Sequence, residues 1–265
     1  MWLRALAVGL ALVLAGCTGF TTGGAEEAVT PAPVPTDGLQ YPPGVTEDGV
    51  VPAALARAHA GSLETTSYTL TTRQTLRDRD GDLVRRVTHV RRVRPGAVRY
   101  AGRFRQNVSQ YRAGFATSAV TYWANESTVA TRYRNERGEV TLLRWAAGGE
   151  RFRDLSDRTR LEGELAAMDL TVVDRTDRGG VVLAGARLAD RDELVTPLFV
   201  HDVTNVSVRM RVAYDGTAVA RRVEYDAAFR GERVHVVRTA RVTGLGATTV
   251  ERPDWVANTT ESERV

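Results

Sequence analysis

Runs in which apolar and polar residues alternate one by one limit the fold of this chain more than any other feature. Four clear runs lie at residues 67–76, 98–105, 205–214 and 219–229, with apolar side chains at most of the alternate positions. One apolar and one polar face at period two are typical of half-buried antiparallel strands. Pairs that favour turns separate the runs, at Asp80-Gly81, Pro95-Gly96, Arg137-Gly138, Asp215-Gly216 and Arg230-Gly231. The pattern predicts an α+β fold, mainly antiparallel β, with about 10–11 strands.

One segment of this β-rich part departs from strict alternation. Between Leu83 and Arg94 the valines fall at positions 84, 87, 90 and 93, a spacing of three. A β-bulge, which adds one residue to one strand of a pair, would reconcile this spacing with a strand.

A few helices are expected around the strands. The first covers Ala53–Leu63, with Asp48 as a capping residue and Pro52 in the first turn. A second covers Thr159–Met168, and a third is expected near Arg191–Leu198. The apolar stripe of the first helix would consist of Val51, Leu55, Ala58 and Leu63.

The N-terminus has the pattern of an export signal. Arg4 precedes an apolar run from Ala5 to Ala15, which is too short for a membrane-spanning helix of about 20 residues. The string Leu14-Ala15-Gly16-Cys17 resembles the lipobox of exported lipoproteins, and Cys17 is the one cysteine in the chain. The resemblance implies a signal peptide over residues 1–16, with cleavage before Cys17 and lipid on its sulfur. We therefore expect a lipid-anchored protein on the extracellular side of the cell membrane.

Composition divides the rest of the chain. Residues 17–47 are rich in Thr, Gly and Pro and predict a flexible tether. Residues 48–258 form a single β-rich domain in this interpretation, and residues 259–265 form a C-terminal tail.

The asparagines indicate exposure outside the cell. Four of the five begin an Asn-X-Ser/Thr sequon, namely Asn107, Asn125, Asn205 and Asn258. These four are candidate glycosylation sites. The alternative is that Thr-rich β sequence produces sequons without use.

Arginine is concentrated in the first strands. Eleven arginines and three aspartates lie between positions 73 and 105, while the whole chain has no lysine and a net charge of +4. Arg99, Arg103 and Arg105 share one parity and are the candidate face for an anionic envelope component, which could be lipid headgroups, anionic glycans or another protein. The alternative is a solvated face whose charges pair with acidic residues elsewhere. Nucleic acid is not expected outside the cell.

The sequence shows no pattern of a catalytic or cofactor site. There is no Gly-rich phosphate loop before a helix, no G-x-S-x-G and no H-E-x-x-H, and the four histidines are isolated. We expect no enzyme activity, no cofactor and no metal. The run Asp78-Arg79-Asp80-Gly81-Asp82 has alternate aspartates, but a hairpin turn explains it better than calcium.

Two short resemblances suggest a class of protein. The stretch Leu55–Gln74 and the string Tyr122-Trp123-Ala124-Asn125-Glu126 resemble the periplasmic lipoprotein-carrier (LolA-like) fold. Residues 41–50, the lipobox and Pro253-Asp254-Trp255 resemble uncharacterised haloarchaeal cell-surface lipoproteins. The carrier resemblance implies a strongly curved sheet or half-barrel, with helices on its concave side and a cavity for acyl chains.

Two functions remain open at this point. The first is a membrane-anchored protein that binds a lipid or other apolar ligand within its sheet. The second is an envelope interaction or structural protein that uses the basic face and has no ligand cavity.

Overall fold

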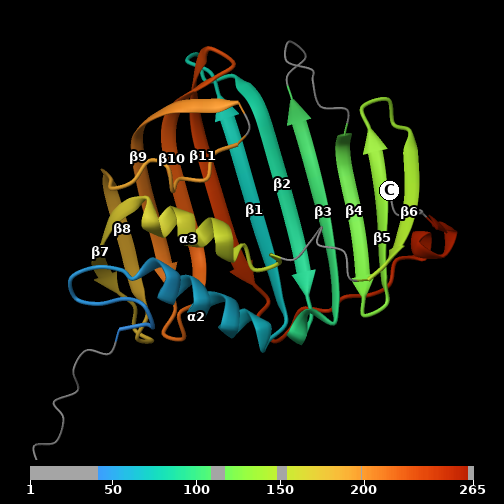
Figure 1. Ribbon diagram of the computed structural model, residues 1–265, viewed down its shortest axis with the longest axis horizontal. Coiled ribbons are helices and arrows are strands. Elements are labelled where there is room, and N and C mark those ends of the chain that lie inside the picture. The colour runs from blue at the N-terminus through green and yellow to red at the C-terminus, as the bar shows by residue number, and fades with distance from the viewer. Residues whose placement is uncertain (1–40, 109–116, 148–153, 198, 262–265) are drawn as a thin grey trace, which may run out of the picture. The chain divides into compact units, whose positions relative to one another are not determined.

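The computed structural model describes residues 41–108, 117–147, 154–197 and 199–261. Within them, all strands join one twelve-stranded sheet in the order β12-β6-β5-β4-β3-β2-β1-β11-β10-β9-β8-β7 (Figure 1). The strands are β1 (Tyr68–Arg77), β2 (Leu83–Val93), β3 (Arg99–Val108), β4 (Thr117–Asn125), β5 (Thr128–Asn135), β6 (Val140–Ala146), β7 (Met168–Arg175), β8 (Val181–Leu188), β9 (Val200–Val212), β10 (Ala218–Phe229), β11 (Glu232–Thr243) and β12 (Thr260–Glu261). Every pairing is antiparallel except that of the two-residue β12 with β6. The predicted class, mainly antiparallel β with about this many strands, is confirmed.

The sheet is open, because its end strands do not pair with each other. Two meanders make it up, β1 to β6 and β7 to β11, and the pairing of β1 with β11 joins them.

Two α-helices lie across one face of the sheet, which we call the inner face (Figure 1). They are α2 (Pro52–Glu64) and α3 (Arg158–Ala166), and short 3₁₀ turns η1 (Pro95–Ala97) and η4 (Asp254–Asn258) occur elsewhere. The first two predicted helices are thus present within one to two residues of their expected ends. Neither described helix is long and apolar enough to cross a membrane.

Three details of the helix predictions were wrong. Val51, not Asp48, is the N-cap of α2, and its side chain is 51% exposed instead of contributing to the apolar stripe. Because Pro52 has no N–H, the first turn has one fewer backbone donor that needs a partner. The helix accordingly begins without a side-chain hydrogen bond from its N-cap residue. The segment Arg191–Pro197 forms only turns, with Leu194 N–H donating to Arg191 O, and not a helix. Leu198 lies outside the described residues.

The main core lies between the helices and the inner face of β1 and β7–β11. Leu55 of α2 and Leu161 of α3 are completely buried there against β-strand side chains such as Leu183 and Met210. A smaller cluster around Leu63 continues the core to β2. Burial of each such side chain contributes about 1.5–3 kcal/mol, so packing under the helices supplies much of the stability.

The folded part begins before the predicted boundary at residue 48. Val45 is buried in the main core, Tyr41 packs against it, and Val45 forms an isolated bridge with Val50. Gly44 has φ +82° and lies against the backbone of Leu55, where a larger residue would not fit. Residues 41–47, assigned to the tether from composition, therefore belong to the domain. At the other end, Thr259–Glu261 of the predicted tail include β12.

The predicted bulge is present in β2 and accounts for part of the valine spacing, the step from Val84 to Val87. Leu76 pairs with Arg85 and Arg77 pairs with Leu83, so Val84 is the additional residue of a bulge. The bulge turns Val84 into the core, whereas Val90 faces the opposite side of the sheet, which we call the outer face.

An ionic cluster lies within the core under α3. Asp157 pairs with Arg91 of β2 and Arg221 of β10, while Glu164 pairs with Arg221 and with Arg238 of β11. These five side chains are buried. Burial lowers the pKa of Arg238 to about 9, and the neighbouring Arg221 and Arg91 lower the pKa of Asp157 despite burial.

The chain after β11 returns along the outer face. Val250 and Val256 pack on Trp123 and Ala130, which point outward from β4 and β5. Thr248 and Thr69 hydroxyls lie 3.1 Å apart. This C-terminal segment thus covers one end of the outer face of β1–β5.

Candidate functional site

The inner face of β2–β6 carries many apolar side chains, with the hydrogen-bonded Arg85–Gln106 pair among them, and no described helix packs over it. The two described helices pack over β1 and β7–β11 and not over the other half of the sheet (Figure 1). The register places a set of partly exposed side chains on this half of the inner face. We call this set the inner apolar surface, and it consists of Val87, Phe104, Val108, Val120, Val129, Tyr133, Leu143 and Trp145.

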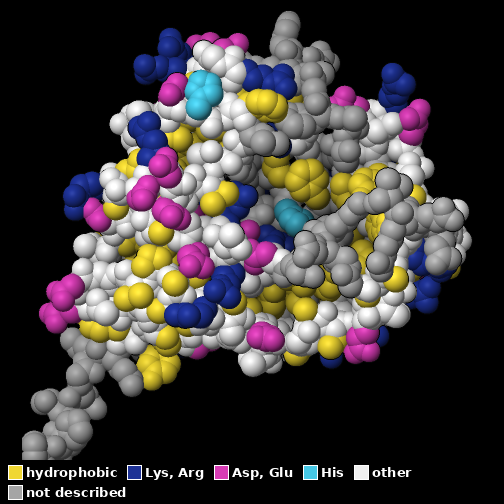
Figure 2. All heavy atoms as spheres, in the orientation of Figure 1, with side chains coloured by type: hydrophobic (Ala, Val, Ile, Leu, Met, Phe, Trp, Pro, Cys, Tyr) yellow, Lys and Arg dark blue, Asp and Glu magenta, His cyan; other side chains and the backbone are white. Residues whose placement is uncertain are grey.

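Figure 2, seen from the helix side, shows hydrophobic side chains gathered in a hollow beside the helices. Isolated apolar side chains on a surface need no explanation, but a continuous set marks a binding site for a ligand or partner. The arrangement can hold an apolar molecule against the sheet.

A His–Tyr pair forms the boundary between this surface and the core. His89 Nε2 of β2 lies 2.8 Å from the hydroxyl oxygen of Tyr122 on β4, across the intervening β3. The two rings meet edge to face with centroids 5.8 Å apart, and Phe104 contacts His89 from the other side. Gly102 of β3 makes this possible, because a Cβ there would overlap the ring of Tyr122. Burial lowers the pKa of His89 to about 4 and raises that of Tyr122, so both are neutral near pH 7.

The predicted arginine face is exposed and outward, as parity suggested. Arg99, Arg103 and Arg105 all lie on the outer face of β3. Arg103 and Arg105 line one groove with arginines of other strands, but Arg99 is not part of it.

The candidate sequons lie at four separate places. Asn107, Asn205 and Asn258 are exposed, whereas Asn125 is partly buried. The Asn205 side-chain amide donates to Asp226, 2.8 Å away. The side-chain oxygen Oδ1 of Asn125 accepts from the Ser127 and Thr128 N–H groups, which closes the turn between β4 and β5. Cys17, the candidate lipidation site, lies outside the described residues.

The Asp78–Asp82 loop is the hairpin turn between β1 and β2. One oxygen of Asp78 accepts from the N–H groups of Asp80 and Asp82, and Gly81 has φ +86°. The carboxylate of Asp78 is therefore the hydrogen-bond acceptor for two backbone N–H groups of the turn. Across the part of the chain that the structure describes, no group of three or more His, Cys, Asp or Glu side chains could hold a metal ion.

Sequence reasoning missed the inner apolar surface, although it predicted the strands that carry it. The alternation in β3 was visible, but the sequence does not say which strands the helices cover. It also missed Arg91, Arg221 and Arg238, which occupy inward positions of otherwise apolar alternation. Arginines at such positions were the available signal for a buried ionic cluster.

Comparison with solved structures gives weak similarities. A DUF1329 family protein from Desulfovibrio piger has 8% identity and a TM-score of 0.29, with 79% of this chain and 97% of that chain covered. The Pseudomonas aeruginosa MucA/MucB complex has 12% identity and a TM-score of 0.34, covering 76% of this chain and 59% of that chain. A LolA superfamily protein from Nitrosomonas europaea has 7% identity and a TM-score of 0.25, covering 77% and 96%. At TM-scores this low, these similarities give no information about the ligand or the partner of this chain.

Comparison with known sequences is more decisive about kinship. No curated protein matches the chain. A family of unknown function, DUF7537, matches residues 2–259, nearly the whole sequence. Helices α2 and α3 and strands β1–β11 all fall within this match, and the chain belongs to the DUF7537 family.

Proposed function

We propose that this protein is an exported, membrane-anchored lipoprotein whose sheet binds a lipid or other apolar ligand on the inner apolar surface. The proposal makes it a binding protein and not an enzyme. The observation that carries it is the partly exposed apolar half of the inner face, over which no described helix lies.

Energetics favour an occupant for this surface. Apolar area removed from water contributes about 25 cal/mol per Å², so side chains such as Phe104 and Leu143 have free energy to gain from a ligand. Strong curvature of the sheet, as in the carrier fold that the sequence resembles, would deepen the surface around an acyl chain. The proposal includes a relationship to haloarchaeal cell-surface lipoproteins, which residues 41–50 resemble.

A matched pair of valine substitutions tests the ligand site. Val120 on β4 and Val90 on β2 are both partly exposed, but they face the inner and the outer side of the sheet. Val120→Gln should weaken binding of a fluorescent fatty acid to the full-length chain about tenfold, the equivalent of one buried valine. Val90→Gln should leave the affinity unchanged. Equal loss in both variants, or no binding by the unsubstituted protein, would refute the proposal.

The native occupant is accessible to mass spectrometry. Protein purified from its own host in mild detergent should release a stoichiometric lipid or similar apolar molecule on denaturation. A Val120→Gln preparation should contain less of it than a Val90→Gln preparation.

The anchor is tested separately. Cys17→Ser should move the protein from the membrane fraction to the medium or leave it as uncleaved precursor. Thr18→Ser, the neighbouring conservative change, should remain lipidated and membrane-bound. Normal processing and membrane retention of Cys17→Ser would show that the folded domain, and not a lipid on Cys17, holds the protein there. Intact-mass measurement of the same preparations would show whether the sequons carry glycans.

A further inference from the structure

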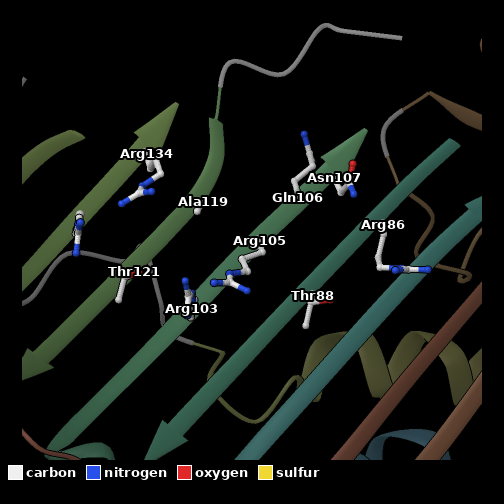
Figure 3. Close-up of a pocket in the computed structure, with 10 residues that line it drawn as sticks. Arg86, Thr88, Arg103, Arg105, Gln106, Asn107, Ala119, Thr121 and Arg134 are labelled. Carbon is white, nitrogen blue, oxygen red and sulfur yellow. The ribbon is translucent and has the colours of Figure 1, made fainter. Parts of the chain in front are cut away.

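The outer face has a basic groove that the proposed ligand site does not use. It lies opposite the inner apolar surface, over β2–β5, and has a volume of about 510 Å³ (Figure 3). Its arginines come from three strands and are Arg86, Arg103, Arg105, Arg132 and Arg134. Figure 3 shows Arg103 and Arg105 side by side on β3, with Arg134 on β5 and Arg86 on β2 to either side.

The strand register arranges these charges in rows across the sheet. In one row Arg134, Ala119, Arg105, Thr88 and Arg73 are successive partners on β5, β4, β3, β2 and β1. Every second strand thus contributes an arginine, with a small side chain between. Because neighbouring strands are about 4.8 Å apart, the charges repeat at about 10 Å.

A second, parallel row lies two residues further along the strands. Arg132 pairs with Thr121, and Thr121 pairs with Arg103. The two rows together give the groove a length of several strands and a width of two charges. A single small anion would use only a part of it.

None of the described residues that line the groove is acidic. Among the described residues, Arg86, Arg103, Arg105 and Arg132 have no ion pair, whereas the outward Arg222 on β10 is paired with Glu224. Burial, together with the charges of Arg105, Arg134 and Arg132, lowers the pKa of Arg103. Like charges held this close cost free energy unless an anion compensates them.

Two acidic side chains of the C-terminal segment lie near the groove. Glu251 and Asp254 line a neighbouring groove that shares only Arg103 and Thr121 with the basic one. The C-terminal segment crosses the outer face at that end, so the arginine rows lie beside a raised wall. A narrow chain can enter such a recess more readily than a flat membrane surface.

The other side chains of the groove indicate the chemistry of the occupant. Thr88, Thr121 and Asn107 offer hydroxyl and amide groups between the arginines, and among the described lining residues only Ala119 has an apolar side chain. Guanidinium groups bind carboxylate and sulfate oxygens through paired hydrogen bonds, and hydroxyl and amide groups bind sugar hydroxyls. An acyl chain or an apolar peptide side chain would find no complementary surface.

We propose that the outer groove binds a linear anionic polysaccharide, laid across the strands with its carboxylate or sulfate groups on the arginine rows. The inference is independent of the apolar ligand, because it concerns the opposite face of the sheet. A glycan on Asn107 would border this groove and restrict access to its end.

Two triple variants with the same change of charge test this groove. One is Arg103→Gln, Arg105→Gln and Arg132→Gln, within the groove. The matched control is Arg57→Gln, Arg79→Gln and Arg137→Gln, whose side chains are exposed and lie outside it. Binding of heparin and of polygalacturonate to the full-length chain is measured by calorimetry at low salt, and thermal unfolding shows that both variants fold.

The groove variant should bind at least about tenfold more weakly, while the control should change less than about threefold. The reason is that the groove variant also loses paired hydrogen bonds to the polysaccharide, which contribute more binding free energy than the change of net charge that both variants share. Heparin and polygalacturonate differ in their anionic group, and their relative affinities identify sulfate or carboxylate as the preferred one. Equal loss in both variants would show that binding reflects net charge alone and would overturn the proposal. So would competition by polyglutamate or by soluble short-chain phosphatidylglycerol as effective as that by the polysaccharides, which would assign the groove to an acidic peptide or to lipid headgroups.

Discussion

The contact between Gly102 and Tyr122 can be tested by adding one methyl group. Gly102→Ala places a Cβ where the ring of Tyr122 now lies. The ring cannot stay, because the added Cβ would overlap its Cζ and hydroxyl oxygen, and it has little free space to enter, because Tyr122 is only 1% exposed. It must move away from β3 and give up its contact with His89.

The expected loss has two parts. Overpacking of this kind costs about 1–3 kcal/mol, and loss of a buried hydrogen bond costs about another 1 kcal/mol. Against these, alanine is favoured over glycine in a strand by about 0.5–1 kcal/mol. The net expectation is a destabilisation of about 1–3 kcal/mol.

Urea unfolding followed by tryptophan fluorescence measures this change. Gly61→Ala is the matched control, because Gly61 is an exposed position inside α2 with no atom within 4 Å of an added Cβ. That substitution should stabilise the protein by about 0.5–1 kcal/mol, so the same chemical change should have opposite signs at the two sites.

A second substitution shows whether the tyrosine ring is the cause. In a Tyr122→Leu background, which removes the ring, Gly102→Ala should lose most of its cost. If Gly102→Ala is neutral in the original sequence, or equally costly without the ring, the packing argument is wrong.

Two further predictions concern buried charge and protonation. Asp157→Asn should lower the free energy of unfolding by about 3–5 kcal/mol, since it leaves the buried Arg91 without its charge partner and leaves Arg221 with Glu164 alone. Asp169→Asn, which breaks an exposed ion pair, should cost less than about 1 kcal/mol. Urea titration of both variants measures the difference, and equal small losses would contradict it. Burial lowers the pKa of His59 from 6.5 to about 4, so the unfolded chain binds the proton first and stability should fall by about 3 kcal/mol as the pH drops from 6.5 to 4. His59→Gln should flatten this fall in a pH series of unfolding curves, leaving the similar contribution of His89, and an unchanged slope would show that His59 is already protonated in the fold.

The strands were predictable because their signal is local. In β9, Val206, Val208, Met210 and Val212 alternate with polar residues, and the structure buries all four. The bulge at Val84 was predictable for the same reason, from a spacing that fits no regular strand. The turns at Gly81 and Gly216 followed from residues that tolerate positive φ.

What depends on partners distant in sequence could not be predicted. The arginine row from Arg134 to Arg73 exists only through the registers of four strand pairs, none of which the alternation specifies. Tyr214 fitted the alternation of β9, yet it lies beyond the strand in the following turn and is 48% exposed. The residues expected to form a helix near Arg191–Leu198 favour helix locally, but this segment connects the paired strands β8 and β9. Its described part makes that connection with a turn and no helix.

The pairing of β1 with β11 sets the order in which this protein can fold. Thr69 pairs with Thr243, so the two ends of the domain meet in the middle of the sheet. A chain made from its N-terminus can form the β1–β2 hairpin early, but one edge of β1 has no partner until nearly the whole domain has emerged. Such long-range pairing slows folding to milliseconds or longer and exposes an unpaired strand edge to other chains meanwhile. The edge of β1 is therefore protected from aggregation only after β11 has been synthesised and has paired with it.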